Sequence, residues 1–223
     1  MAQRLEGIRA RIGAAAQRAG RQPHDITLVA VSKYAPDDAV MALYELGIRD
    51  FGESRIQDAI PRVQRFPPDC RWHMIGHLQR NKVRAALPVF RSIHSIDSDR
   101  LMSEVIREAE VRPPATPIEL FIQFNVSGEE SKYGLEPDRL DEAMRLLERL
   151  PDSLRVMGLM TMAPYSDDPE AARPVFARLR QLRDRLASAV LPLPALSMGM
   201  SGDFEVAIEE GATHIRVGSS LFS

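Results

Sequence analysis

The segment ITLVAVSK, residues 26–33, decides the fold. It is apolar and rich in β-branched residues, and it is too short for a typical helix, so it predicts a buried strand. Further segments of this kind recur along the chain, with longer amphipathic segments between them. They are IRDFGES (48–54), RWHMIGHL (71–78), SIHSID (92–97), IELFIQFNVS (118–127), RVMGLMTM (155–162), ALSMGMS (195–201) and HIRVGSS (214–220).

The segments between these strand candidates have helical periodicity. A helix is expected over roughly 2–19, a second one begins with Pro36-Asp37-Asp38, and a third covers 137–150. A fourth carries apolar residues at helical spacing, Val175, Leu179, Leu182 and Leu186, and its arginines are expected on a solvated face. Strands that alternate with helices indicate a parallel sheet. Eight such units in 223 residues predict a single (β/α)8 TIM-type barrel over residues 1–223, with an extra N-terminal helix. The alternative is an open, doubly wound sheet.

Composition narrows the class of protein. Hydrophobic residues make up 44% of the chain and charged residues 27%, which is ordinary for a soluble protein with a sizeable core. The net charge of −2 gives no general electrostatic reason to bind nucleic acid or an anionic membrane. No apolar run approaches the length of a membrane span, and charges are scattered through the first residues, unlike a secretory signal. A single cysteine, Cys70, excludes an internal disulfide framework. We therefore expect a cytoplasmic protein.

Lys33 ends the first strand candidate. Strand alternation places Val29, Val31 and Lys33 on one face and the residues between them on the other. If the first set faces the barrel axis, Lys33 is an amine at the mouth of an apolar tunnel. Desolvation there disfavours the ammonium form, which makes the amine nucleophilic towards an aldehyde. The alternative is a lysine that extends into solvent after a strand.

Two turns rich in glycine and serine follow the last two strand candidates. In LSMGMSGDF (196–204), Ser201 or Gly202 is expected to cap the next helix, and HIRVGSSLF (214–222) carries Gly218, Ser219 and Ser220. In barrels of this type, phosphate sites are often built from the loops after the seventh and eighth strands with a helix N-terminus. The pair of turns predicts an anion site, although each turn alone is also ordinary turn chemistry.

Arg216 lies mid-strand among apolar residues. A buried guanidinium is costly unless it is paired or donates hydrogen bonds. Two interpretations are open: an ion pair with a carboxylate such as Glu53, or donation to a heteroatom of a ligand. An amine, an anion site and a central arginine together match the aldehyde, phosphate and ring nitrogen of pyridoxal 5'-phosphate (PLP).

Several long motifs occur in order along almost the whole chain. They are ITLVAVSK (26–33), FGESRIQDA (51–59), WHMIGHLQRNK (72–82), HSIDS (94–98), QFNVSGEESKYGL (123–135), GLMTMAP (158–164), LSMGMSGDFEVAI (196–208) and IRVGSSLF (215–222). By these motifs the chain resembles a known family, the pyridoxal phosphate homeostasis proteins, which share the N-terminal barrel fold of alanine racemase. The resemblance implies that Lys33 forms a Schiff base with PLP, that Ser201, Gly218 and Ser219 hold its phosphate, and that Arg216 faces the pyridine nitrogen.

The resemblance also bears on turnover. Arginine cannot accept a proton, so it leaves the PLP ring a weaker electron sink than an acidic partner would. Alanine racemase takes a second acid–base group, a tyrosine, from a C-terminal β-domain that is expected to be absent here. We therefore expect a monomeric PLP-binding protein of PLP homeostasis, without catalytic residues or a metal, that holds PLP without robust turnover. PLP-dependent apoenzymes are its candidate partners.

Two other functions stay open. One is a PLP enzyme acting on an untested amino acid, for which Tyr133 and Tyr165 follow strand candidates and could act as acid–base groups. The other is a barrel that binds a phosphorylated metabolite, in which Lys33 only pairs with the phosphate.

The chain departs from the family pattern at Ser54. The family commonly has FGEN where this chain has FGES, and serine is shorter than asparagine and has one donor, so any cofactor contact by that amide is in doubt. Gln123 and Asn125 share a strand face and need polar partners, which the cofactor or other barrel residues could supply.

Three further features are assigned no chemistry. His73 and His77 are not expected to converge on a metal, because they lie in a strand-to-loop segment and not on one helix face. Lys132 is expected to be a solvated loop lysine, and Cys70 is expected in a loop without a reactive role.

Overall fold

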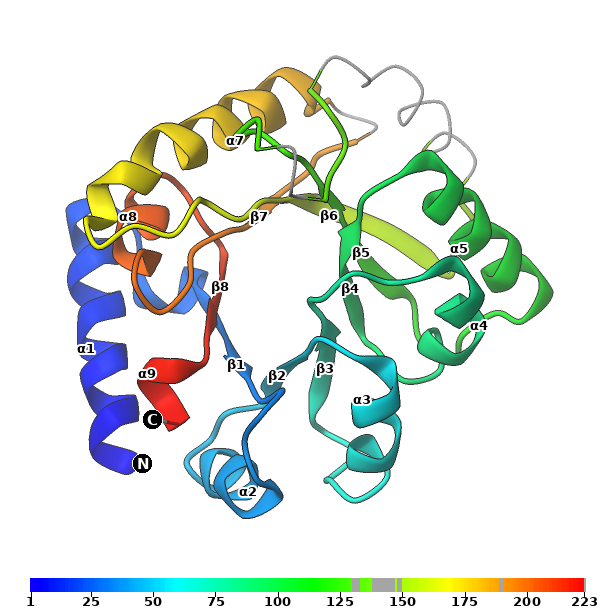
Figure 1. Cartoon of the computed structure of the whole chain (residues 1–223), viewed down its shortest axis with the longest axis horizontal. Coiled ribbons are helices and arrows are strands. Elements are labelled where there is room, and N and C mark those ends of the chain that lie inside the picture. The colour runs from blue at the N-terminus through cyan, green and yellow to red at the C-terminus, as the bar shows by residue number, and fades with distance from the viewer. Residues whose placement is uncertain (130–132, 138–146, 148–149, 189–190, 223) are drawn as a thin grey trace.

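The computed structural model describes residues 1–129, 133–137, 147, 150–188 and 191–222. Eight parallel strands close into a barrel in chain order, β1 to β8, with β1 paired to β8 (Figure 1). The strands are β1 (Thr27–Val31), β2 (Asp50–Glu53), β3 (Arg71–Met74), β4 (Ser92–Ile96), β5 (Ile118–Gln123), β6 (Leu154–Met160), β7 (Ala195–Ser197) and β8 (His214–Val217). The expected (β/α)8 barrel is confirmed, and the open sheet is excluded because the two outer strands pair.

Helices follow the strands around the outside of the barrel (Figure 1). The α-helices are α1 (Ala2–Arg18), α2 (Asp37–Glu45), α3 (Ile56–Val63), α4 (Val83–Ala86), α5 (Asp99–Val111), α7 (Arg173–Leu186), α8 (Phe204–Glu209) and α9 (Ser219–Phe222). Short 3-10 turns lie at η1 (Pro23–Asp25), η2 (Arg80–Lys82) and η3 (Pro169–Ala172). The expected opening helix, the helix after Pro36 and the helix through Leu179 are all present. Most of the helix expected over 137–150 lies outside the described residues.

Each expected strand is present but ends earlier than its sequence segment. The strand after Ile26, for example, ends at Val31, and Ser32 and Lys33 already belong to the loop that follows. The residues left over at the C-terminal ends therefore become loop residues on one rim of the barrel, where (β/α)8 proteins build their sites.

The apolar core lies between the sheet and the surrounding helices. Phe51, Trp72 and Phe66 pack with ring centroids 5.4–6.4 Å apart on this outer side of the sheet. Two arginines of α7 form ion pairs. Arg180 pairs with Glu210, and Arg183 pairs with Asp184 of the same helix. These two pairs agree with the expected solvated face.

The barrel interior, in contrast, contains three histidine rings. His73, His94 and His214 lie within 5.1–6.4 Å of one another, and Phe121 contacts two of them. Buried polar side chains need partners, so an interior of this kind implies a hydrogen-bond network along the barrel axis.

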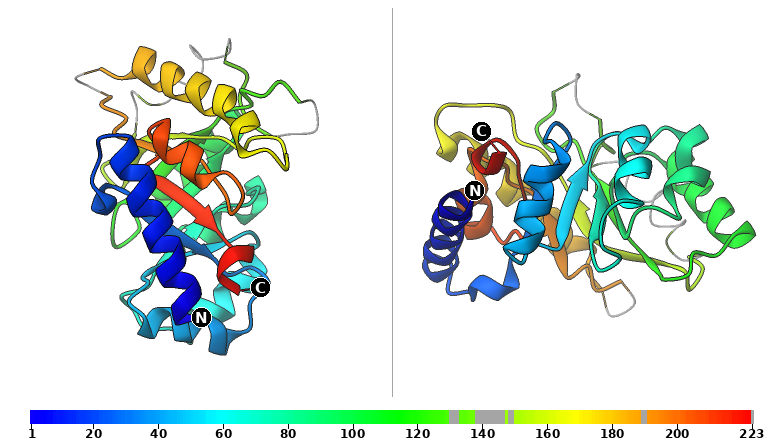
Figure 2. Two further views of the ribbon diagram at one scale, coloured as in Figure 1. Left: turned by 90° about the vertical axis from the view of Figure 1, so that its left-hand side faces the viewer. Right: turned by 90° about the horizontal axis from the view of Figure 1, so that it is seen from below.

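The N-terminal helix α1 lies beside α8 and α9, so the two chain ends are close (Figures 1 and 2). Arg11 pairs with Glu205 and Arg18 with Glu209, each at 2.7 Å, and Arg21 donates to the carbonyl of Ala212 at 2.6 Å. The extra helix therefore covers the barrel where β8 meets β1. Within the described residues, no helix combines the length and hydropathy needed to cross a membrane.

Candidate functional site

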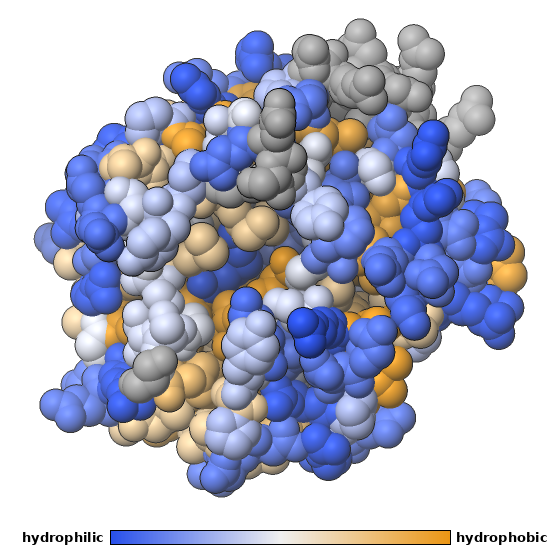
Figure 3. All heavy atoms as spheres, in the orientation of Figure 1, coloured by the Kyte–Doolittle hydropathy of each residue, from blue (hydrophilic) through white to orange (hydrophobic). Residues whose placement is uncertain are grey.

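A pocket of about 770 Å³ opens at the C-terminal rim of the barrel. The face of the molecule shown in Figure 3 is hollowed near its centre, with hydrophilic and apolar surface side by side. The structure brings all five sequence-predicted site residues to this one pocket: Lys33, Ser201, Arg216, Gly218 and Ser219. They come from the loops after β1, β7 and β8 and from β8 itself, and strands β7, β8 and β1 are consecutive around the barrel.

Lys33 lies at the pocket with an exposed side chain, its Nζ 5.2 Å from the ring centroid of Tyr34. The alternation expected for this segment holds at its end. Val31 lines the same pocket, whereas the intervening Ser32 is buried and donates its hydroxyl to Glu53 Oε1 at 2.7 Å. The amine is therefore available to a ligand in the pocket.

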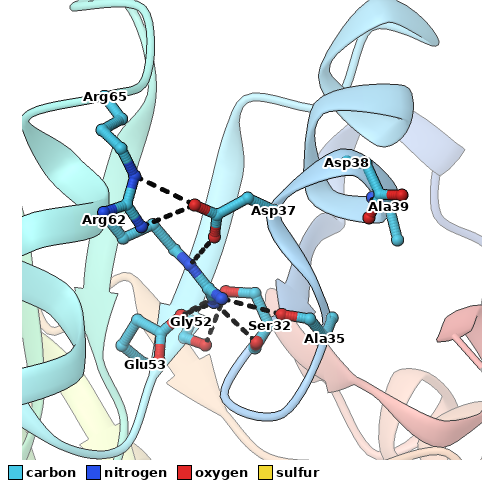
Figure 4. A network of polar contacts seen from close by, with 9 residues as sticks. All are labelled: Ser32, Ala35, Asp37, Asp38, Ala39, Gly52, Glu53, Arg62 and Arg65. Atoms are coloured by element: carbon cyan, nitrogen blue, oxygen red, sulfur yellow. Dashed lines mark hydrogen bonds and ion pairs between the residues drawn. The ribbon is translucent and has the colours of Figure 1, made fainter.

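Arg62 fixes the loop that carries Lys33 (Figure 4). Its guanidinium donates to the carbonyl oxygens of Ser32 and Ala35, both at 2.7 Å, so the backbone is held on each side of the lysine. The same group pairs with Glu53 Oε1 at 2.6 Å and with Asp37 Oδ1 at 2.9 Å. Glu53 is fully buried, so Arg62 also neutralises a carboxylate inside the protein.

Arg216 is 4% exposed and lines the pocket. The interpretation that it pairs with Glu53 is wrong, because Glu53 lies on the other side of β1 and is neutralised by Arg62. Arg216 instead donates to Ser197 Oγ at 2.6 Å and to the carbonyl of Thr161 at 2.9 Å. Burial lowers its pKa to about 10, so the group remains a cation at neutral pH.

A chain of hydrogen bonds runs from Arg216 through the barrel interior. Ser197 Oγ lies 2.7 Å from His94 Nδ1, His94 Nε2 lies 3.0 Å from His73 Nδ1, and His73 Nε2 lies 3.0 Å from Asp50 Oδ1. An ionised carboxylate only accepts hydrogen bonds, so His73 donates from Nε2 to Asp50. With His73 neutral, its Nδ1 accepts from His94 Nε2, and His94 Nδ1 accepts from the hydroxyl of Ser197. In that state every donor points from Arg216 towards Asp50.

Arg216 and Asp50, at the two ends of this series of hydrogen bonds, carry opposite charges. Burial is the main cause that holds the pKa of His94 well below its usual value, with smaller contributions from His73, His214 and Arg216, so this ring is neutral. Burial raises the pKa of Asp50, but hydrogen bonds from His73 and Arg71 outweigh it and hold that pKa below the usual range. The interior is therefore a polarised relay between a buried cation at the pocket and a carboxylate at the opposite end of the barrel.

The two glycine–serine turns meet at the pocket. The hydroxyl of Ser201 accepts a hydrogen bond from the N–H of Gly218 at 3.3 Å. Helix α9 begins at Ser219, so its first N–H groups have no intrahelical carbonyl and are donors for an anion. Gly199 has φ +93°, and a Cβ there would lie 2.5 Å from Ala207 Cβ, so the first turn requires glycine.

The expected helix cap at Ser201 or Gly202 is wrong. Residues 201–203 form a turn instead, because the N–H groups of Asp203 and Phe204 both donate to the carbonyl of Met200. The N-cap of helix α8 is therefore Asp203, one or two residues later than expected, and the Asp203 carboxylate accepts from the N–H of Met200. Ser201 is thereby left at the pocket, where its hydroxyl meets Gly218.

Ser54, the departure from the family pattern, also lines the pocket. Its backbone lies against Gly76, where a Cβ would be 2.3 Å from the carbonyl oxygen of Ser54. The loops after β2 and β3 are therefore in close contact, and only glycine fits at position 76.

The sequence assigns no site role to one pocket residue, His77. His77 Nδ1 lies 2.6 Å from Asp97 Oδ2, and the His77 ring stacks on Tyr133 with centroids 4.2 Å apart. His77, Tyr133 and Tyr165 all line the pocket. The signal in the sequence that indicates His77 is its position just past a strand. From the sequence, His77 is weighed only as a metal ligand together with His73.

The other sequence expectations have simple outcomes. His73 and His77 do not converge, since His73 contacts His94 inside the barrel while His77 lies at the rim. Gln123 and Asn125 donate to the carbonyls of Tyr133 and Glu129, so both find partners in the loop after β5. Cys70 is buried just before β3, and burial raises its pKa to about 11. Lys132 lies outside the described residues. No cluster of metal-ligating side chains occurs within the described part of the chain.

Comparisons with known proteins extend over the whole chain. The family model for the alanine racemase N-terminal domain matches residues 4–223. The chain is 41% identical over 222 residues to a pyridoxal phosphate homeostasis protein of Aquifex aeolicus, covering 99% of this chain and 96% of the relative. It is 40% identical over 224 residues to the Pseudomonas aeruginosa protein of the same name, covering 100% and 94% of the two chains.

Solved structures agree with this relationship. PipY of Synechococcus elongatus, solved with PLP bound, superposes with a TM-score of 0.84 at 34% identity, covering 100% of this chain and 99% of that one. Alanine racemase of Corynebacterium glutamicum shares the fold, with a TM-score of 0.69 at 17% identity over 97% of this chain and 61% of that chain. The chain therefore belongs to the pyridoxal phosphate homeostasis protein family, whose barrel is the alanine racemase N-terminal domain.

Proposed function

We propose that this chain binds PLP in the rim pocket, holds it as a Schiff base on Lys33, and acts in intracellular PLP homeostasis. The observation that carries the proposal is the convergence of an accessible amine, a pair of glycine–serine turns and a buried cation on one pocket. PLP has three groups that need these partners: an aldehyde, a phosphate and a ring nitrogen. The PLP-bound relative PipY supports the assignment.

Each of the five residues takes one role in this proposal. Lys33 supplies the amine, Ser201, Gly218 and Ser219 hold the phosphate, and Arg216 faces the pyridine nitrogen. Bound PLP supplies an electron sink, which is strongest when its ring nitrogen is protonated. Arg216 stays cationic and has no proton-accepting site, so it keeps the ring unprotonated and the sink weak. We therefore propose binding without robust turnover, with delivery to PLP-dependent apoenzymes by a cytoplasmic monomer.

Absorbance and borohydride reduction test the binding mode. Protein incubated with PLP should turn yellow, and reduction should attach the cofactor to the peptide that contains Lys33, as read by mass spectrometry. Lys33→Ala should give no adduct. Lys82→Ala is a matched control, because Lys82 is a lysine that does not line the pocket, and it should behave as the unaltered protein. An adduct that persists in Lys33→Ala would refute the assignment, and a protein that binds only phosphate would indicate a phosphorylated metabolite instead.

A PLP-dependent enzyme is the second candidate, favoured by the placement of Tyr133 and Tyr165 at the pocket. Both side chains are well exposed, at 58% and 91%, and Tyr165 donates to Asp167, so they lie at the rim and not deep in the site. Exchange of the α-proton in deuterated water across a panel of amino acids distinguishes the candidates. Exchange that depends on PLP would establish an enzyme, and its absence would support the binding role.

A further inference from the structure

His77 lines the pocket and pairs with Asp97, on the side of Lys33 opposite the glycine–serine turns. His77 follows β3 and Asp97 follows β4, whereas the turns follow β7 and β8. Lys33, after β1, lies between these two groups along the rim. The roles proposed above for the cofactor leave this pair unused.

The position of the His77 ring is determined by two contacts. Asp97 Oδ2 lies 2.6 Å from Nδ1, and Tyr133 stacks on the ring with an interplanar angle of 16°. The Tyr133 backbone is itself tied to β5, because the buried side chain of Gln123 donates to its carbonyl oxygen at 2.8 Å. A histidine that only extended into solvent would not be held from two neighbouring strands in this way.

The contacts also determine which nitrogen is available. Asp97 has a side chain only 6% exposed, and its ionised carboxylate accepts hydrogen bonds, so Nδ1 of His77 donates to it. Nε2 is then the basic nitrogen, and it has no hydrogen-bond partner among the described residues. The ring is 37% exposed and lines the pocket. A carboxylate in this position holds the tautomer and stabilises the imidazolium, as in nucleophile–histidine–carboxylate triads.

We propose that His77, oriented by Asp97, is the proton acceptor that prepares a primary ammonium group entering this pocket, so that the amine can take the place of Lys33. The inference rests on the proposed binding of PLP at Lys33. An N–H bond of the ammonium breaks, its electron pair stays on the amine nitrogen, and the proton forms a new bond to Nε2. The positive charge passes to the imidazole beside Asp97. Only the uncharged amine is a nucleophile, so this step precedes any exchange.

The pocket also contains other charged groups that face this reaction. Lys33, Arg216, Asp168 and Asp203 all line it. A pH profile of exchange would therefore mix several groups. Substitution and chemical rescue at His77 separate its contribution from theirs.

The first test uses cofactor-free protein and nitrogen-15 NMR of the histidine rings. Neutral His77 should carry its proton on Nδ1, and Asp97→Asn should weaken that preference. The opposite tautomer in the unaltered protein would overturn the proposal, because Nε2 would then be a donor. This readout does not depend on whether PLP binds.

The second test measures how fast bound cofactor moves to an added amine, by stopped-flow absorbance, with glycine and with Nα-acetyl-lysine as probes. His77→Gln should slow the transfer about 100-fold, within the range of general acid–base catalysis, while the protein still gives the Lys33 adduct on reduction. Imidazole in solution should restore part of the rate in His77→Ala. His24→Gln is the matched control, since His24 is exposed and lies away from the pocket, and its rate should be unchanged.

The outcomes separate the two proposals. Equal transfer rates for His77→Gln and the unaltered protein, with the adduct present, would overturn the role of His77 alone. Absence of the adduct from the unaltered protein would refute the proposed function. A rate that depends on His77 with glycine only would identify free amino acids as the amine, whereas dependence with acetyl-lysine would identify lysine side chains.

Discussion

Removing Arg62 tests the argument that this residue holds the Lys33 loop. Arg62→Met keeps an unbranched apolar side chain but removes the guanidinium and its four hydrogen bonds to Ser32, Ala35, Glu53 and Asp37. Glu53 would then remain fully buried, with only the hydroxyl of Ser32 as a donor. Breaking a buried ion pair on one side typically costs about 3–5 kcal/mol, because the other charge is left uncompensated. We expect a loss of this size in the free energy of unfolding.

Urea denaturation followed by circular dichroism measures this loss, and Arg65 supplies the control. Arg65 pairs with the same Asp37 but has a side chain 57% exposed (Figure 4). Arg65→Met should therefore cost no more than about 1 kcal/mol. The double variant Arg62→Met, Glu53→Gln should recover part of the stability lost in Arg62→Met, because the uncompensated charge is gone.

The same variants test the link to function. Because Arg62 fixes the backbone on both sides of Lys33, Arg62→Met should also reduce the fraction of protein that gives the Lys33 adduct under subsaturating PLP. A loss of stability equal to that of Arg65→Met, or a double variant no better than Arg62→Met, would refute the reasoning about the buried charge.

Three further changes probe the interior relay and the turn before α8. Ser197→Ala removes one of the two acceptors of Arg216, so it should cost about 1–3 kcal/mol in urea unfolding and shift the absorbance maximum of bound PLP. An unchanged spectrum would show that the relay does not reach the cofactor. Burial lowers the pKa of His214 to about 3. Between about pH 6.5 and pH 3, His214 is therefore protonated in the unfolded chain but neutral in the folded protein. Stability should therefore fall as pH falls through this window, by up to about 1.4 kcal/mol per pH unit for this group, and His214→Gln should make the slope shallower. Gly199→Ala should lower the free energy of unfolding by about 3 kcal/mol, because of the positive φ at this position and the close Ala207 Cβ. Gly202→Ala, with open space around it, should change the free energy of unfolding by less than about 0.5 kcal/mol. Equal losses would contradict the strain argument.

Much of the fold was predictable because it depends on local patterns. Short β-branched segments such as the one ending at Val31 alternate with amphipathic helices, and this order alone restricts the sheet to a parallel one. The predicted site residues follow from the same logic, since residues just past the strand ends meet at one rim. Their roles toward PLP remain predictions, but their convergence on one pocket is now observed.

The errors have a common physical origin. The sequence suggests Glu53 as a partner of Arg216. The partner of a strand residue depends on which face of the sheet its side chain lies on, and Glu53 contacts Arg62 instead. The cap of α8 was placed at Ser201 or Gly202 because both residues suit an N-cap, whereas the turn closed by Met200 delays the helix to Phe204. In both cases residue type was compatible with the expectation, and geometry selected a different contact.

The sequence by itself determined that short strands alternate with helices around a parallel sheet, and it identified an amine, two turns and a guanidinium as the groups of one site. Periodicity and turn chemistry suffice for that, because both act over a few residues. Only the tertiary structure decided that His94 joins Ser197, more than a hundred residues away, in a relay to Arg216, and that His77 meets Asp97 at the pocket. These contacts depend on strand stagger and on the closure of β1 against β8, which bring side chains together across the barrel and leave no local pattern in the sequence.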